Sequence, residues 1–230
     1  MQKFIKALFL ISISASILSI ISIIFMYFII KPNLPEIRYV DESVLQMPLK
    51  VLTKDGVLIG EFGEIKRRAK SFDEIPYYIK SAFLAAEDDN FFNHQGISYT
   101  GLIRSFIRCM RPSGCEGGGG TITMQVVRGY LLTPEQTISR KIKEIFLALE
   151  LESNVGKEEI FELYVNRVFL GNRSYGIEAA ANTYFNKSLE NLSIDESATI
   201  AAIAQLPSRI NPVKNPRRTL QRRNWILSRM

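Results

Sequence analysis

The sequence predicts a mainly α-helical domain that follows an apolar N-terminal segment and a short β-hairpin. Three observations support this fold class. Apolar residues recur at helical spacing in most segments after residue 70, and several of these segments open with capping signals. Only residues 49–63 (LKVLTKDGVLIGEFG) alternate as paired strands do, around an Asp-Gly turn. A chain of 230 residues, 47% of them hydrophobic, suits one core with appendages.

The N-terminal segment from Ala7 to Ile30 contains no charged residue. About 24 residues of helix extend roughly 36 Å, enough to cross a hydrocarbon layer of ~30 Å. We expect an uncleaved membrane anchor at 7–30 behind a cytoplasmic tail at 1–6. A secretory signal peptide is the alternative, but no small-residue cleavage site follows the run before Lys31. Basic residues on both sides of the segment leave its orientation open.

Residues 31–63 are expected to form a linker and the hairpin, and residues 64–230 the main domain. Within that domain Cys109 and Cys115 flank a turn-prone stretch. Outside the cytoplasm they would be able to close a small disulfide loop, and free thiols are the equal alternative. A metal site at this pair is disfavoured because no third or fourth ligand is nearby.

The first helix of the main domain is expected from Asp73 to Ala86, with Asp73 as N-cap and Pro76 in the first turn. It runs into EDDNFFNHQG, which holds the only histidine of the chain. Glu87 would lie at the helix end, where unpaired carbonyls and apolar neighbours raise the pKa of a carboxyl. A raised pKa suits a general base. The alternative is an ordinary solvated carboxylate at a helix terminus.

A second group of polar residues follows a run of four glycines at 117–120. On a helix, Thr121, Gln125 and Arg128 fall at i, i+4 and i+7, so a hydroxyl, an amide and a guanidinium share one face. The run is not a phosphate-binding P-loop, because the Gly-Lys-Ser/Thr ending is absent. A flexible loop leading into a surface helix is the alternative explanation.

The next helix is expected to begin at Thr133, which precedes Pro134 and a capping glutamine, and to run to about Glu152. In it Arg140 and Lys141 lie one turn before Glu144, so two cations frame a carboxylate. Such a group is usually a solvent-exposed ion pair of little energetic value. The same cations would also suit phosphate oxygens.

Two further helix starts are marked near the C-terminus. Ser193 and Glu196 form a capping-box pattern before an alanine-rich helix that should stop at Pro207, and Asn215-Pro216 should open a last, basic helix. Residues 209–229 carry seven basic residues and no acidic ones. A solvated face explains this charge, as would binding to anionic lipid or phosphate. Because the chain is expected to be membrane-anchored, we expect no nucleic-acid partner.

These residues together resemble the glycosyltransferase module of class A penicillin-binding proteins and the monofunctional peptidoglycan glycosyltransferases, known as family 51. The resemblance runs in order from Leu49 onward. The first family motif, E-D-x-x-F-x-x-H-x-G, is met by Glu87, Asp88, Phe91, His94 and Gly96. The third, R-K-x-x-E, is met by Arg140, Lys141 and Glu144. Residues 162–185 and 192–212 match the fourth and fifth.

The second motif, G-G-S-T-x-T-Q-Q-x-x-K-N, is met only in part. Thr121, Thr123 and Gln125 match it, and Arg128 stands where lysine is usual. Three further positions depart from the motif: Gly120 replaces serine, Met124 replaces glutamine and Gly129 replaces asparagine. We expect Met124 and Gly129 to weaken substrate contacts.

The resemblance implies a lysozyme-like fold and an inverting transferase that polymerises lipid II into β-1,4 glycan strands, releasing undecaprenyl pyrophosphate. Glu87 would be the general base and Glu144 the second catalytic carboxylate. Glu144 would either orient the neighbouring cations or help to hold a divalent ion such as Mg²⁺ or Mn²⁺. The implied substrate-binding residues are Asp88, Phe91, His94, Thr121, Gln125, Arg128, Arg140 and Lys141. Asp88 and His94 are expected to support the Glu87 turn, and Asn166 is expected to be structural.

The resemblance also implies a place and partners for the chain. We expect a single-pass protein of the bacterial inner membrane with an extracytoplasmic catalytic domain, acting on lipid II and the growing glycan beside membrane lipid and other wall-synthesis proteins. The transpeptidase motif S-x-x-K does not occur, so no cross-linking domain is expected. Two alternatives remain: a weakly active, truncated class A penicillin-binding protein that acts as a scaffold for wall synthesis, and a lysozyme-like muramidase.

Overall fold

The computed structural model describes residues 14, 17–18, 21, 25, 28–29, 31–35, 49–55, 58–62, 70–101, 103, 120–133 and 137–230. Most of the expected anchor at 7–30, the two cysteines and residues 117–119 of the glycine run lie outside these residues. Within the described part of the chain, no helix is both long and apolar enough to cross a bilayer.

The described elements are mainly helical, as the sequence predicts. A short 3-10 helix, η1 (Lys31–Asn33), precedes two antiparallel strands, in which Leu49 lies opposite Phe62. The strands are β1 (Leu49–Leu52) and β2 (Leu58–Phe62). The longer helices are α2 (Tyr77–Glu87), α4 (Ile122–Leu131), α5 (Ile138–Asn154), α6 (Lys157–Arg167), α7 (Ile177–Phe185), α8 (Ile194–Gln205) and α9 (Pro216–Leu227). Short 3-10 helices lie at η4 (Phe91–Asn93) and η5 (Leu189–Asn191).

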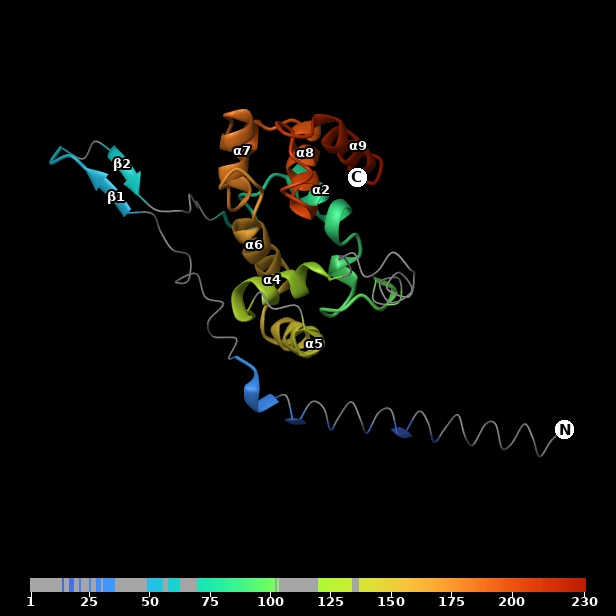
Figure 1. The fold of residues 1–230 in the computed structure, drawn as a ribbon. Helices are drawn as coiled ribbons and strands as arrows, with labels where there is room; N and C mark the ends of the chain where they lie inside the picture. The colour runs from blue at the N-terminus through green and yellow to red at the C-terminus, as the bar shows by residue number, and fades with distance from the viewer. Residues whose placement is uncertain are drawn as a thin grey trace.

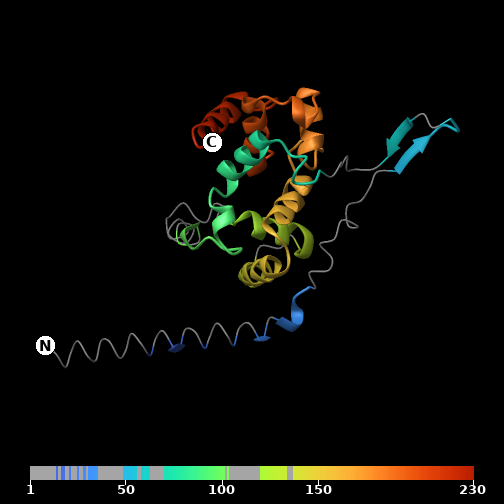
Figure 2. The same cartoon turned by 180° about the vertical axis from the view of Figure 1, so that it is seen from behind.

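The helices pack as two groups joined by α6. In both views α7, α8 and α9 lie at one end of the molecule and α5 at the other, with α6 between them (Figures 1 and 2). Helix α2 packs on α8 and α9, while α4 packs on α5 and α6. The largest fully buried side chains include Phe83, Phe91 and Phe161, which join the two groups into one core. Burial of such side chains is the main stabilising term of the domain.

The start of α2 differs from the sequence expectation. The helix begins at Tyr77, with Pro76 at its N-cap, so Asp73 is not its cap. Residues 72–74 form a turn instead, in which the Glu74 carboxylate accepts hydrogen bonds from the backbone N–H and hydroxyl of Ser71. The end of the helix agrees with the prediction, because Glu87 is its last residue.

The start of α5 also differs. Thr137, and not Thr133, caps this helix, because the Thr137 hydroxyl accepts a hydrogen bond of 3.1 Å from the Arg140 N–H. The other two predicted starts are confirmed. Ser193 and Glu196 form the reciprocal capping box of α8, and Asn215 precedes Pro216 in the first turn of α9.

Asn166 is structural, as expected. Its buried amide donates a hydrogen bond of 2.8 Å to the Lys70 carbonyl and accepts one of 2.9 Å from the Lys70 N–H. These two bonds hold residue 70 against α6. Gly176 lies against the same residue with φ +82°, and a Cβ there would come within 2.7 Å of the Asn166 carbonyl oxygen. This glycine therefore allows the start of α7 to approach α6.

Candidate active site

Glu87 lies at the end of α2 with its carboxyl directed at α4. Its Oε2 accepts a hydrogen bond of 2.8 Å from Gln125 Nε2, while its Oε1 is buried without a partner among the described residues. Burial raises the pKa of Glu87, and the Gln125 hydrogen bond and the charges of Arg222 and Arg128 act in the opposite direction. A carboxyl with a raised pKa is suited to accept a proton as a general base.

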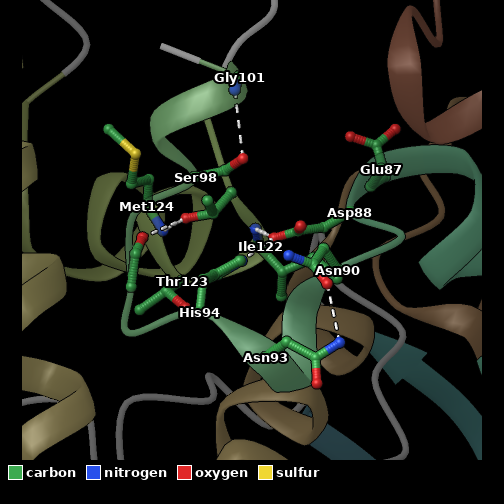
Figure 3. Close-up of polar contacts among 12 residues, drawn as sticks. Glu87, Asp88, Asn90, Asn93, His94, Ser98, Gly101, Ile122, Thr123 and Met124 are labelled. Carbon is green, nitrogen blue, oxygen red and sulfur yellow. Dashed lines mark hydrogen bonds and ion pairs between the residues drawn. The ribbon is translucent and has the colours of Figure 1, made fainter.

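The turn after Glu87 is held by Asp88. Asp88 Oδ2 accepts 3.1 Å from the Ile122 N–H and lies 2.9 Å from His94 Nε2. Figure 3 shows the two neighbouring carboxylates pointing apart, Asp88 toward Ile122 and Glu87 away from it. The network ties the end of α2 to the start of α4, so it fixes the direction of Glu87.

Four of the expected substrate-binding residues are buried and engaged within the protein. Asp88 and His94 pair with each other at 2.9 Å. Phe91 is fully buried and packs edge-on against Phe92 and His94, which corrects the expectation that it contacts substrate. Thr121 is the N-cap of α4, and its hydroxyl donates 2.6 Å to the Gly96 carbonyl. These side chains shape the site without facing a ligand.

Helix α4 therefore presents fewer polar groups than its sequence suggests. Thr123 is buried and donates to Glu152, so it also faces inward. Met124 is fully buried in the core, and the expectation that it weakens a substrate contact is wrong for that reason. Of the expected α4 residues, only Gln125, which is half-buried, and Arg128, which is exposed, remain available to a ligand.

The third motif places a buried carboxylate on α5. Glu144 is 1% exposed, and its Oε1 accepts 3.0 Å from Lys141 Nζ. Its Oε2 is buried without a partner in the described structure, and so is Arg140 Nε. Of the two cations expected to frame Glu144, only Lys141 contacts it. The group adjoins the start of α4, because a Cβ at Gly120 would meet Glu144 Oε1 at 3.5 Å and Lys141 Nζ at 3.9 Å.

Glu144 offers one carboxylate oxygen that would suit a divalent ion. Across the described ranges, no three His, Cys, Asp or Glu side chains gather at one point. The partnerless Oε2 of Glu144 fits one coordination position, which suits ions such as Mg²⁺ that take a single carboxylate together with phosphate oxygens and water.

The structure adds two residues that sequence reasoning missed. Arg222 of α9 donates 2.9 Å to the Ala86 carbonyl, stacks 4.0 Å from the Trp225 ring centroid, and has a pKa lowered by burial. Tyr164 of α6 is buried, its hydroxyl has no partner among the described residues, and burial and the charge of Glu87 raise its pKa. Tyr164 lies within residues 162–185, which match the fourth family motif. No pattern among the neighbouring residues indicated a role for Arg222.

Comparisons with known proteins agree with the motifs. A family model described as Transglycosylase matches residues 55–230. Penicillin-binding protein 1A of Pseudomonas aeruginosa is 49% identical over 204 residues, which is 89% of this chain and 25% of that protein. Penicillin-binding protein 1A of Escherichia coli is 39% identical over 229 residues, which is 100% of this chain and 27% of that protein.

A crystal structure of penicillin-binding protein 1A from Haemophilus influenzae is also similar, with 32% sequence identity and a TM-score of 0.43 over 81% of this chain and 18% of that one. The chain thus spans about a quarter of the length of the relatives in the two sequence comparisons. The match over residues 55–230 confirms the resemblance to family 51. The chain belongs to the transglycosylase family.

Proposed function

We propose that this chain is a peptidoglycan glycosyltransferase that polymerises lipid II into β-1,4 glycan strands. The observation that carries this proposal is the half-buried Glu87 carboxyl, one oxygen of which has no partner among the described residues and lies beside the charges of Arg128 and Arg222. Membership of the transglycosylase family supports glycosyl transfer as the reaction class.

Glu87 is the general base in this mechanism. Its carboxylate takes the proton from the 4-hydroxyl of the acceptor N-acetylglucosamine, and that oxygen attacks the anomeric carbon of the donor chain. The bond from the anomeric carbon to the pyrophosphate oxygen breaks, and undecaprenyl pyrophosphate leaves with the electron pair. Attack opposite the leaving group inverts an α-linked donor to a β product. Gln125 holds one carboxylate oxygen, which leaves the other to accept the proton.

The leaving pyrophosphate needs charge neutralisation more than protonation. Arg128, Arg140 and Lys141 are the residues we assign to it, because charge-assisted contacts strengthen as negative charge builds on the leaving oxygens. Lys141 is already held by Glu144 at 3.0 Å, so Glu144 orients a cation. Where a divalent ion takes part, Glu144 Oε2 is the atom that would hold it, and the ion would supply further positive charge at the phosphates.

The site of action follows from the substrate. Donor and acceptor are both held in the membrane by polyprenyl tails, so the enzyme must bind them at the membrane surface. An enzyme tethered to that membrane gains effective concentration there. We therefore assign the chain to the bacterial inner membrane, with an anchor at 7–30 and an extracytoplasmic catalytic domain. Its relatives are named penicillin-binding proteins, and other wall-synthesis proteins are the proposed partners.

Incubation of the full chain with labelled lipid II, with and without Mg²⁺ or Mn²⁺, tests this function. A glycan ladder that a muramidase digests is the expected result. Cleavage of preformed glycan by the chain itself would favour the muramidase alternative. Folded protein that gives neither product would leave the scaffold alternative.

A further inference from the structure

An open pocket of about 210 Å³ lies between α4 and α6, next to the Glu87 site. It is lined by Gln125, Arg128, Gly129, Tyr130, Arg167 and Phe169, among others. Gln125 belongs to both places, because its side chain donates to Glu87 and also lines the pocket. A group bound in this α4–α6 pocket would therefore lie beside the proposed base.

Gly129 makes room for Arg167 in the pocket. A Cβ at Gly129 would lie 3.3 Å from Arg167 Nε and 3.6 Å from its Cδ, a contact tight enough that the arginine would have to move. The Arg167 guanidinium carbon lies 4.2 Å from the centroid of the Tyr130 ring, so the group is stacked. Gly129 stands where the family motif has asparagine, and the space that this glycine leaves is occupied by Arg167 of the facing helix α6.

The pocket holds two arginines, and the charge of one of them, Arg128, also acts on Glu87. Within the part of the chain that the structure describes, neither Arg128 nor Arg167 forms an ion pair. The hydroxyl of Tyr164, a residue that also lines the pocket and is 4% exposed, is a buried donor without a partner. Two guanidinium groups and a phenol are donors of the kind that bind oxyanions.

The pocket includes Arg128, one of the cations assigned to the leaving pyrophosphate, but it does not include Lys141 or Glu144. That pair adjoins Gly120 at the start of α4, whereas Arg128 lies about eight residues further along, which is roughly 12 Å of helix. Positive groups therefore lie near both ends of α4, with Gln125 and Glu87 between them.

We propose that the α4–α6 pocket binds an oxyanion of the lipid-linked substrate, a phosphate or a carboxylate, and that Arg167 is the residue that selects it. The proposal rests on the proposed function for the identity of the substrate. A phosphate of the polyprenyl pyrophosphate and a carboxylate of the stem peptide share this chemistry. Because the Arg167 guanidinium is stacked on Tyr130, its paired N–H donors have a fixed orientation toward a phosphate or a carboxylate.

Calorimetric titration of the full-length chain with inorganic pyrophosphate, and separately with a soluble N-acetylmuramoyl peptide, tests the pocket without turnover. The probe whose affinity falls in Arg167→Gln identifies the source of the anion. We expect a loss of about tenfold or more, as for a charged hydrogen bond worth ~1.5–3 kcal/mol. Arg218→Gln removes the same charge from an exposed position on α9 and should bind as the wild type does. Unchanged affinity of Arg167→Gln for both probes would overturn the proposal.

Gly129→Asn provides a second variant that keeps both arginines. Its side chain would occupy the space beside Arg167, so the same probe should bind more weakly while the melting temperature stays near that of the wild type. In lipid II turnover, both variants should lower kcat/KM. The loss should lie in KM if the anion is the stem-peptide carboxylate, and in kcat as well if it is the leaving pyrophosphate. One further outcome is a wild type that makes no polymer and still binds a probe with an affinity that falls in Arg167→Gln. That result would support the anion-binding pocket and contradict the transferase function.

Discussion

The amide of Gln125 donates a 2.8 Å hydrogen bond to Oε2 of Glu87, and this contact joins α4 to the end of α2 at the proposed catalytic centre. The other carboxylate oxygen, Oε1, has no partner in the part of the chain that the structure describes. The bond also favours the ionised carboxyl, in opposition to the burial that raises its pKa.

Removal of this bond in Gln125→Leu should therefore raise the pKa of Glu87 further. Because a general base acts only when ionised, the acid limb of the pH dependence of kcat/KM for lipid II should move to higher pH. Gln205→Leu, at an exposed position on α8, is the matched control. An acid limb that stays in place, or moves to lower pH, would mean that Gln125 does not tune Glu87.

Asp88 should contribute more to stability than to chemistry. Asp88→Ala leaves the Ile122 N–H and His94 without their buried acceptor, so we expect a loss of about 1–3 kcal/mol in the free energy of unfolding. Asp88→Asn retains an oxygen that can accept from Ile122 and should lose less. Denaturant unfolding of the two variants measures the difference, and equal stability of Asp88→Ala and wild type would contradict the network.

Gly96 is required by the backbone of the first motif. Its φ is +78°, and a Cβ would lie 2.8 Å from the Ala148 carbonyl oxygen. Gly96→Ala should destabilise the domain by at least about 1–2 kcal/mol, because both the conformation and the contact are unfavourable. Gly156→Ser is the control, since nothing lies within 4 Å of a Cβ there and the added hydroxyl can cap α6. Thermal unfolding should rank Gly96→Ala lowest of the three proteins.

The Lys141–Glu144 pair should contribute both to stability and to activity. A double mutant should separate these two contributions. Lys141→Met leaves the buried Glu144 carboxylate without its only partner in the described structure and should lower the melting temperature. Adding Glu144→Gln removes the buried charge and should restore much of that stability without restoring lipid II turnover. Recovery of turnover in the double mutant would exclude a role for both residues in the reaction.

Local signals predicted the parts of the fold that depend on neighbouring residues. The end of α2 at Glu87, the capping box of Ser193 and Glu196 and the start of α9 at Pro216 all follow from nearby sequence. The misplaced starts of α2 and α5 show the limit of such signals. Several Ser, Thr or Asp residues near a helix start are equally good caps, and tertiary packing decides among them.

Long-range contacts explain what the sequence did not predict at the site. Arg222 meets Ala86 across 136 residues, and no local pattern distinguishes it from the other arginines of α9. Helical spacing placed Thr121 with Gln125 and Arg128, but Thr121 is the cap, and its side chain turns back to Gly96. Phe91 matches a family motif, yet it is fully buried in the core.

The role of Glu87 is the central claim, and Glu87→Gln tests it most directly. Because burial raises the pKa of this carboxyl, its contribution to stability falls as pH rises from the unfolded pKa through the higher folded one. At neutral pH the glutamine variant should therefore unfold at the same temperature as the wild type or a higher one. The measurement is lipid II turnover by folded wild type and Glu87→Gln, with products resolved by gel. A glycan ladder from the wild type that the variant reduces at least about a hundredfold is the predicted result, and a full ladder from Glu87→Gln would contradict the account.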